Sequence, residues 1–148
     1  MRRAGRAGGG IAVLMLVGLS MAACSDKATK AEGDHGAAAV EPVKGTDLGR
    51  VTVTKDAARR LDIQMEAVTA TAGGQGTQIP YGAVLYDPQG DTWAFVNVSA
   101  LTFVRAPIDV DHIEGDVAFL SGGPPAGTKV VKVGAAELYG AEIGVGDE

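Results

Sequence analysis

The chain has a single cysteine, Cys24, and lacks an apolar run long enough to cross a membrane. With one thiol no disulfide can form within the chain, so the fold must be stabilised by core packing. The uncharged apolar run Ile11–Leu19 is about half the roughly 20 residues that a spanning helix needs. These two absences exclude a disulfide framework and indicate that the apolar run is not a stable anchor by itself.

Basic residues are scarce outside the N-terminal segment. Residues 1–23 contain three arginines and no acidic residue, so the rest of the chain has 10 basic and 18 acidic residues, a net charge of −8. Such a balance disfavours a nucleic-acid partner, because binding to phosphates depends on clustered Lys and Arg.

The order of residues at the N-terminus is that of a secretory signal. Positive charges come first, the apolar run follows, and small residues lead directly into Cys24. The stretch Met21-Ala22-Ala23-Cys24 resembles the lipobox of bacterial lipoproteins, although Leu is more usual than Met at position 21. This resemblance implies removal of residues 1–23, lipidation of Cys24 and an extracytoplasmic domain held to the cell membrane, since two or three acyl chains bind firmly. The alternative is an ordinary signal peptide that leaves an unpaired thiol.

Residues 24–46 are expected to form a flexible tether. They are mainly Ala, Gly, Lys, Glu and Asp, with almost no large apolar side chain, so burial cannot offset the entropy of ordering them. His35 lies in this stretch, and a lone exposed histidine is more often inert than a ligand. The remaining residues, 47–148, are enough for one modest core.

The pattern from Arg50 onward predicts a mostly β fold: a small barrel or sandwich-like domain of hairpins with one short helix. Val51 and Val53 alternate with polar residues, and Thr54 is placed to cap the short helix. Further strands are expected at 63–67, 83–86, 92–98, 103–110, 116–120 and 129–133, with turns at 87–90 and 112–115 and a helical turn at 135–139. Strand 92–98 has apolar residues on both faces, which predicts a central position in the sheet.

Several of these segments together are similar to a known family. Ile79–Val84, Tyr86–Gly90, Thr92–Val96 and Phe103–Arg105 resemble the membrane-proximal domain of periplasmic adaptor subunits, or membrane fusion proteins, of resistance-nodulation-division efflux pumps. The likeness continues through residues 114–138, and residues 51–68 are similar to the stretch that leads into the adaptors' β-barrel. It implies a non-catalytic adaptor, without cofactor, that docks on a membrane transporter or another envelope protein.

The chain also departs from that family. Asp111 stands where the adaptors usually have Gly, and their Gly-Leu-x-Pro-Gly turn is replaced by residues 122–127. Full adaptors insert a lipoyl-like module and a long helical hairpin where only Thr69–Thr77 intervene here. Because the hairpin meets the outer-membrane channel in such pumps, this chain is not expected to bridge two membranes.

An acidic segment offers an alternative function, a cation or solute receptor. It supplies oxygen ligands that calcium prefers, at Asp109, Asp111, His112, Glu114 and Asp116. The simpler interpretation is a solvated strand face that runs into a turn. Catalysis is not expected, because neither Ser99 nor Ser121 lies in a Gly-x-Ser-x-Gly elbow.

The aromatic residues allow two interpretations. In a small sheet they usually fill the core, but on an uncovered face they would form a docking stripe for a partner. The residues concerned are Tyr81, Tyr86, Trp93, Phe95, Phe103 and Phe119.

Overall fold

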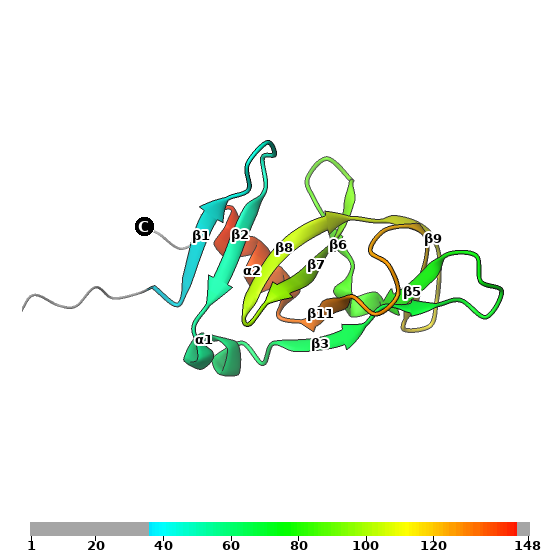
Figure 1. The fold of residues 1–148 in the computed structure, drawn as a ribbon, viewed down its shortest axis with the longest axis horizontal. Helices are drawn as coiled ribbons and strands as arrows, with labels where there is room; N and C mark the ends of the chain where they lie inside the picture. Colours follow the sequence, from blue (N-terminus) through cyan, green and yellow to red (C-terminus); the bar gives the residue numbers. More distant parts are fainter. Residues whose placement is uncertain (1–35, 145–148) are drawn as a thin grey trace, which may run out of the picture. The chain divides into compact units, whose positions relative to one another are not determined.

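The computed structural model describes residues 36–144, and these residues form a mostly β domain as predicted (Figure 1). Within this range there are eleven strands, two α-helices and one 3-10 turn. The strands are β1 (Ala38–Pro42), β2 (Gly49–Val53), β3 (Gln64–Ala67), β4 (Thr69–Ala70), β5 (Thr77–Pro80), β6 (Leu85–Tyr86), β7 (Thr92–Ser99), β8 (Thr102–Pro107), β9 (Asp109–Glu114), β10 (Val117–Gly122) and β11 (Lys129–Val133). The helices are α1 (Lys55–Arg60) and α2 (Ala135–Glu142), and the 3-10 turn is η1 (Tyr81–Ala83).

The strands form two antiparallel sheets. Sheet A has the order β1-β2-β8-β7-β11-β3, with β6 paired to β7, and sheet B has the order β4-β5-β10-β9. The predicted central position of the strand at 92–98 is confirmed, because β7 lies between β8 and β11. Its residues alternate between two buried environments, since Ala94 and Phe95 are both fully buried but belong to different hydrophobic clusters.

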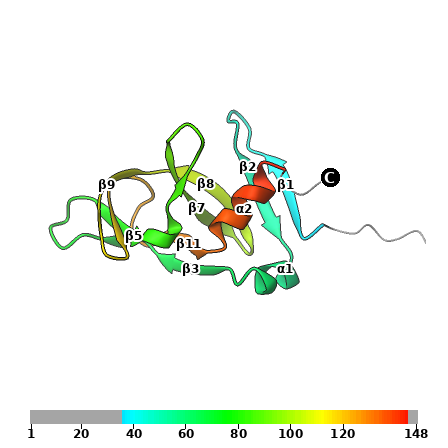
Figure 2. The same cartoon turned by 180° about the vertical axis from the view of Figure 1, so that it is seen from behind.

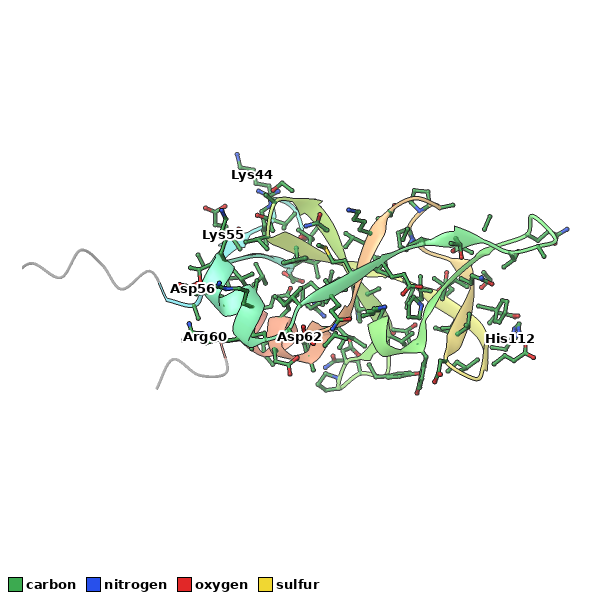
Figure 3. The ribbon with its side chains drawn as sticks, turned by 90° about the horizontal axis from the view of Figure 1, so that it is seen from below. Lys44, Lys55, Asp56, Arg60, Asp62 and His112 are labelled. Atoms are coloured by element: carbon green, nitrogen blue, oxygen red, sulfur yellow. The ribbon has the colours of Figure 1, made fainter. Side chains whose placement is uncertain are left out.

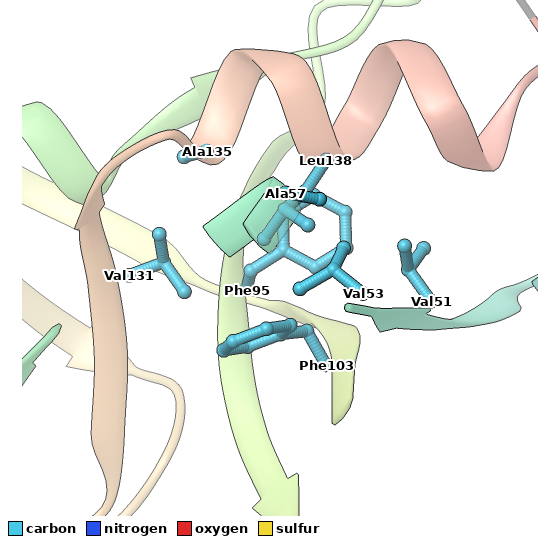
Figure 4. Packing of buried hydrophobic residues seen from close by; sticks show 8 residues of the cluster. All are labelled: Val51, Val53, Ala57, Phe95, Phe103, Val131, Ala135 and Leu138. Atoms are coloured by element: carbon cyan, nitrogen blue, oxygen red, sulfur yellow. The ribbon is translucent and has the colours of Figure 1, made fainter. Parts of the chain in front are cut away.

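The first cluster, which we call the aromatic core, lies between sheet A and the two helices (Figure 4). Val51 and Val53 enter it from β2, as their alternation predicts, and α2 lies across the sheet (Figure 2). The members of the aromatic core are Val51, Val53, Ala57, Phe95, Phe103, Val131, Ala135 and Leu138. Both helices are therefore held by their small or branched residues on this face.

The second cluster, the aliphatic core, joins the opposite face of β7 and β11 to sheet B. Its members are Val68, Ile79, Ala83, Ala94, Ile108, Ala118, Leu120 and Val130. Because adjacent residues of β11, Val130 and Val131, lie in different cores, this strand links the two halves of the domain.

The predicted helix starts are confirmed. The Thr54 hydroxyl accepts a hydrogen bond from the Ala57 N–H at 3.1 Å, which satisfies one of the free donors of α1. The helical turn expected at 135–139 extends to Glu142, and it follows Gly134, whose φ of 89° suits glycine. The strand expected at 83–86 is shorter than predicted, because residues 81–83 form η1 and only Leu85–Tyr86 pair with β7.

The prediction of a single strand at 103–110 is wrong. The segment divides into β8 in sheet A and β9 in sheet B, with the change of sheet after Pro107. A proline has no N–H to continue the ladder, and the next residue, Ile108, donates its N–H to the Thr92 carbonyl at 3.0 Å. The predicted turn at 112–115 is also displaced. It lies at Gly115-Asp116, where Gly115 has a φ of 57°.

The tether boundary is also corrected. Residues 38–42, placed in the flexible segment, form β1, which pairs with β2 from Ala38 opposite Val53 to Pro42 opposite Gly49. Only Val40 in β1 is a large apolar residue, so the local composition gave no strand signal. The stabilisation comes from backbone hydrogen bonds with β2, the next strand in the chain, rather than from the side chains of β1.

No helix within residues 36–144 has the length and apolar character needed to cross a membrane.

Candidate functional site

The acidic residues do not converge on one point. Asp109, Asp111, His112 and Glu114 lie along β9, an exposed edge strand of sheet B, and Asp116 lies in the turn that follows. A register irregularity opposite β10 leaves Asp111 without a paired residue, and its carboxylate contacts the Nδ1 of His112 at 2.8 Å. Within the described range, no three His, Cys, Asp or Glu side chains are grouped so that they could hold a metal ion.

The residues around His112 make packing contacts and hydrogen bonds within sheet B. Its ring stacks on Phe119 with the ring centroids 4.4 Å apart and the planes 5° from parallel. A hollow of about 450 Å³ beside it is lined partly by Gln75, Phe119 and Ser121. The Ser121 hydroxyl donates to the backbone carbonyl of Asp109 at 3.3 Å, so its contact is with the neighbouring strand. This geometry gives no specific support to the cation-receptor alternative.

The aromatic residues divide between the two predicted roles. Phe95 and Phe103 are fully buried, and Trp93 and Phe119 are half-buried. Tyr81 and Tyr86 are 41% and 53% exposed. Desolvation, together with a hydrogen bond to Tyr81, raises the pKa of Tyr86 above its ordinary value. The predicted docking stripe is therefore reduced to one exposed tyrosine pair, Tyr81 in η1 and Tyr86 in β6.

A buried ion pair that the sequence did not reveal fixes α2 to sheet A. Arg105, on β8, donates from Nε to Glu142 Oε2 at 2.5 Å, and the two side chains are only 11% and 3% exposed. The other carboxylate oxygen of Glu142 accepts the Gly49 N–H at 2.8 Å. The Arg105 guanidinium also lies 4.9 Å from the ring centroids of Trp93 and Tyr139.

The turn before β7 supports the same network. The Trp93 indole N–H donates to Asp87 Oδ2 at 3.0 Å, and the other carboxylate oxygen accepts the N–H groups of Gln89 and Asp91. Desolvation raises the pKa of Asp87, but these hydrogen bonds outweigh it and hold the pKa below its ordinary value. The turn predicted at 87–90 is thus confirmed and tied to the aromatic residue that packs on Arg105.

Arg105 and Glu142 are 37 positions apart in the sequence. The only local signal was a charged residue in a predicted strand, and this does not identify its partner. Cys24 and His35, the candidate lipidation site and the lone tether histidine, lie outside the described residues.

Comparison with known proteins gives no match to any family model, curated protein or solved structure.

Proposed function

We propose that this protein is a lipid-anchored extracytoplasmic adaptor, a non-catalytic module that binds a membrane transporter or another envelope protein. The observation that carries the proposal is the position of Cys24, directly after a signal-like segment and before an adaptor-like β domain. Acylation at this position would hold the domain close to membrane proteins. Its role is then to bind a partner rather than to convert a substrate.

The exposed tyrosine pair is the surface that best fits such binding. Tyr81 and Tyr86 belong to the two segments, 79–84 and 86–90, that most resemble the periplasmic adaptors. Tyrosine is enriched at protein interfaces because its ring supplies rigid contact area and its hydroxyl forms hydrogen bonds. Gly82, which follows Tyr81 in η1, approaches the Lys132 carbonyl too closely for a Cβ atom to fit, since that atom would lie 2.9 Å from the oxygen. Tyr81 is thus presented by a turn fixed against β11, and Tyr86 by the short strand β6, which pairs with β7.

The proposal is tested by crosslinking in cells followed by affinity purification of the full chain. We expect an integral membrane protein to be recovered with the wild type. The double variant Tyr81→Ala/Tyr86→Ala should reduce that recovery about tenfold or more, as truncation of central aromatic contacts does.

Val40→Ala is the matched control, because Val40 is an exposed apolar residue (43%) on β1, the edge strand of sheet A that lies three strands from β7 and its partner β6. It should leave recovery unchanged. Failure to recover any membrane protein from cells that express the chain well contradicts the proposed function. Equal recovery with the tyrosine variant contradicts only the choice of surface.

A further inference from the structure

The chain reaches the folded domain beside α1. The N–H of Thr54, the residue that caps α1, donates to the Ala37 carbonyl at 3.2 Å. Ala38, which follows Ala37 in the chain, pairs with Val53 at the start of β1. Residues 25–37 therefore join Cys24 to a point next to α1, and they span at most about 45 Å when fully extended.

An open groove lies against α1 at this end of the domain. Its volume is about 690 Å³. Ala58, Ile63 and Leu101 provide an apolar floor, and these same residues pack on the outside of the aromatic core. The rim is charged and consists of Lys55, Asp56, Arg59 and Asp62.

Backbone strain is concentrated in the same groove. Asp62 and Leu101 are the two non-glycine residues of positive φ within residues 36–144, at 49° and 53°, and both line it. Aspartate tolerates this conformation, but a leucine in it costs about 1 kcal/mol or more. A glycine at position 101 would relieve the strain. The β7–β8 turn instead keeps the apolar side chain of Leu101 next to α1.

The charges of the domain are distributed unevenly between its two ends, and Figure 3 labels Lys55 and Arg60 at the end that contains α1. The segments that build sheet B, residues 69–80 and 109–122, contain four acidic residues and no Lys or Arg. The end next to Ala37 has Lys55, Arg59 and Arg60 within one six-residue helix, with Asp56 paired to Arg59. An anionic surface would therefore attract the α1 end and repel the sheet B end.

We propose that this face docks on the anionic phospholipid headgroups of the membrane that holds Cys24. Lys55 and Arg60 bind headgroup phosphates, and Leu101 and Ile63 contact the apolar boundary below them. The proposal rests on the proposed lipid anchor, which keeps this end within reach of the bilayer. The tether is a poor occupant of the groove, because residues 25–37 contain no large apolar side chain.

Hydrogen exchange on the acylated full-length mature protein tests this inference. The protein is reconstituted in vesicles of phosphatidylcholine, with or without phosphatidylglycerol, after its N-terminal modification has been verified by mass spectrometry. We expect exchange at residues 54–63 and 98–102 to slow severalfold on the anionic vesicles only, because each basic side chain near an anionic surface strengthens binding about fivefold. Exchange in sheet B should be equal on both.

Two charge-matched variants make the result specific. Lys55→Gln/Arg60→Gln should abolish the protection, whereas Lys129→Gln/Lys132→Gln, which also removes two positive charges but from β11, should retain it. Protection that is absent, equal on neutral vesicles or unchanged in the α1 variant overturns the proposal. Protection that needs native membranes, and is not seen on protein-free anionic vesicles, assigns the face to a protein partner and also overturns it. An unacylated Cys24 would instead contradict the proposed anchor.

Discussion

The hydrophobic cores at the two ends of the domain differ in composition. The aromatic core under α1 and α2 contains Phe95 and Phe103 and is closed by the buried pair of Arg105 and Glu142. The aliphatic core beneath sheet B has no aromatic side chain, and three of its eight members are alanines, Ala83, Ala94 and Ala118. Apolar stabilisation scales with the area buried, so we infer that the end containing α1 and α2 provides most of the stability.

The same contrast separates the proposed roles of the surfaces. The α1 end has a basic helix, a groove and the helix α2 fixed by buried charges, whereas sheet B ends in the acidic edge strand β9. Charged side chains on an edge strand disfavour pairing with further strands. Both features are consistent with the proposal that the α1 end docks on the membrane while the sheet B end stays in solvent.

The largest effect is expected from truncating the centre of the aromatic core. Phe103→Ala should lower the free energy of unfolding by about 4 kcal/mol, because it removes a fully buried ring and leaves a cavity. Phe119→Ala removes the same ring from its half-buried position on sheet B and should lower the stability by less than about 2 kcal/mol. Urea unfolding measures both variants, and a larger loss for Phe119→Ala would reverse the comparison.

Removing one partner of the buried ion pair should have the next largest effect. Arg105→Ala leaves the Glu142 carboxylate, which is 3% exposed, without its cation, and should destabilise the fold by about 3 kcal/mol. The control is Arg59→Ala, which breaks an ion pair whose side chains are 80% and 71% exposed and should change stability by about 0.5 kcal/mol or less. Similar thermal shifts for both variants would show that α2 is not held by this pair.

Adjacent residues of β11 give a sharper comparison. Val131 and Val130 are both fully buried, one in each core. Replacing either by alanine should cost about 2 kcal/mol, with Val131→Ala worse by about 1 kcal/mol because its rigid aromatic neighbours cannot fill the cavity. Chemical denaturation of the two variants measures the difference. A larger loss for Val130→Ala would place the main core under sheet B.

The smallest effect concerns pH. The ordinary pKa of this carboxyl group is 3.8, and the hydrogen bonds to Asp87 lower the pKa in the folded protein. Its contribution to stability is therefore complete above pH 3.8 and is lost as the pH falls through the lower pKa of the folded state. Asp87→Asn should therefore flatten the decline of the melting temperature in acid. The neighbouring Asp91→Asn is the charge-matched control and should leave the decline as it is in the wild type. Parallel curves for wild type and Asp87→Asn would contradict the hydrogen-bonded turn.

Local patterns predicted much of this fold because the relevant physics is local. The alternation of Val51 and Val53, the cap at Thr54 and the Asp-Pro-Gln-Gly turn each depend on residues within a few positions. Strand β1 was missed because its pairing energy comes from β2 rather than from its own side chains. The change of sheet after Pro107 was not predicted, since the position of β9 depends on its pairing with β10 in sheet B.

The candidate site was less predictable, because its contacts depend on strand register and helix packing rather than on local sequence patterns. Regular alternation along 109–116 did not reveal the irregular register that brings Asp111 to His112. The contact between Arg105 and Glu142 depends on how α2 packs, which no spacing encodes. The exposure of Tyr81 and Tyr86, in contrast to Phe95 and Phe103, depends on which faces the helices cover.

The most direct test of the account is the intact mass of the N-terminal peptide from protein extracted from membranes. The account predicts a chain that begins at Cys24 and has a diacylglyceryl group on its sulfur and a further acyl chain on its amino group. A free thiol at Cys24, in protein recovered from the soluble cytosolic fraction with residues 1–23 still attached, would contradict it.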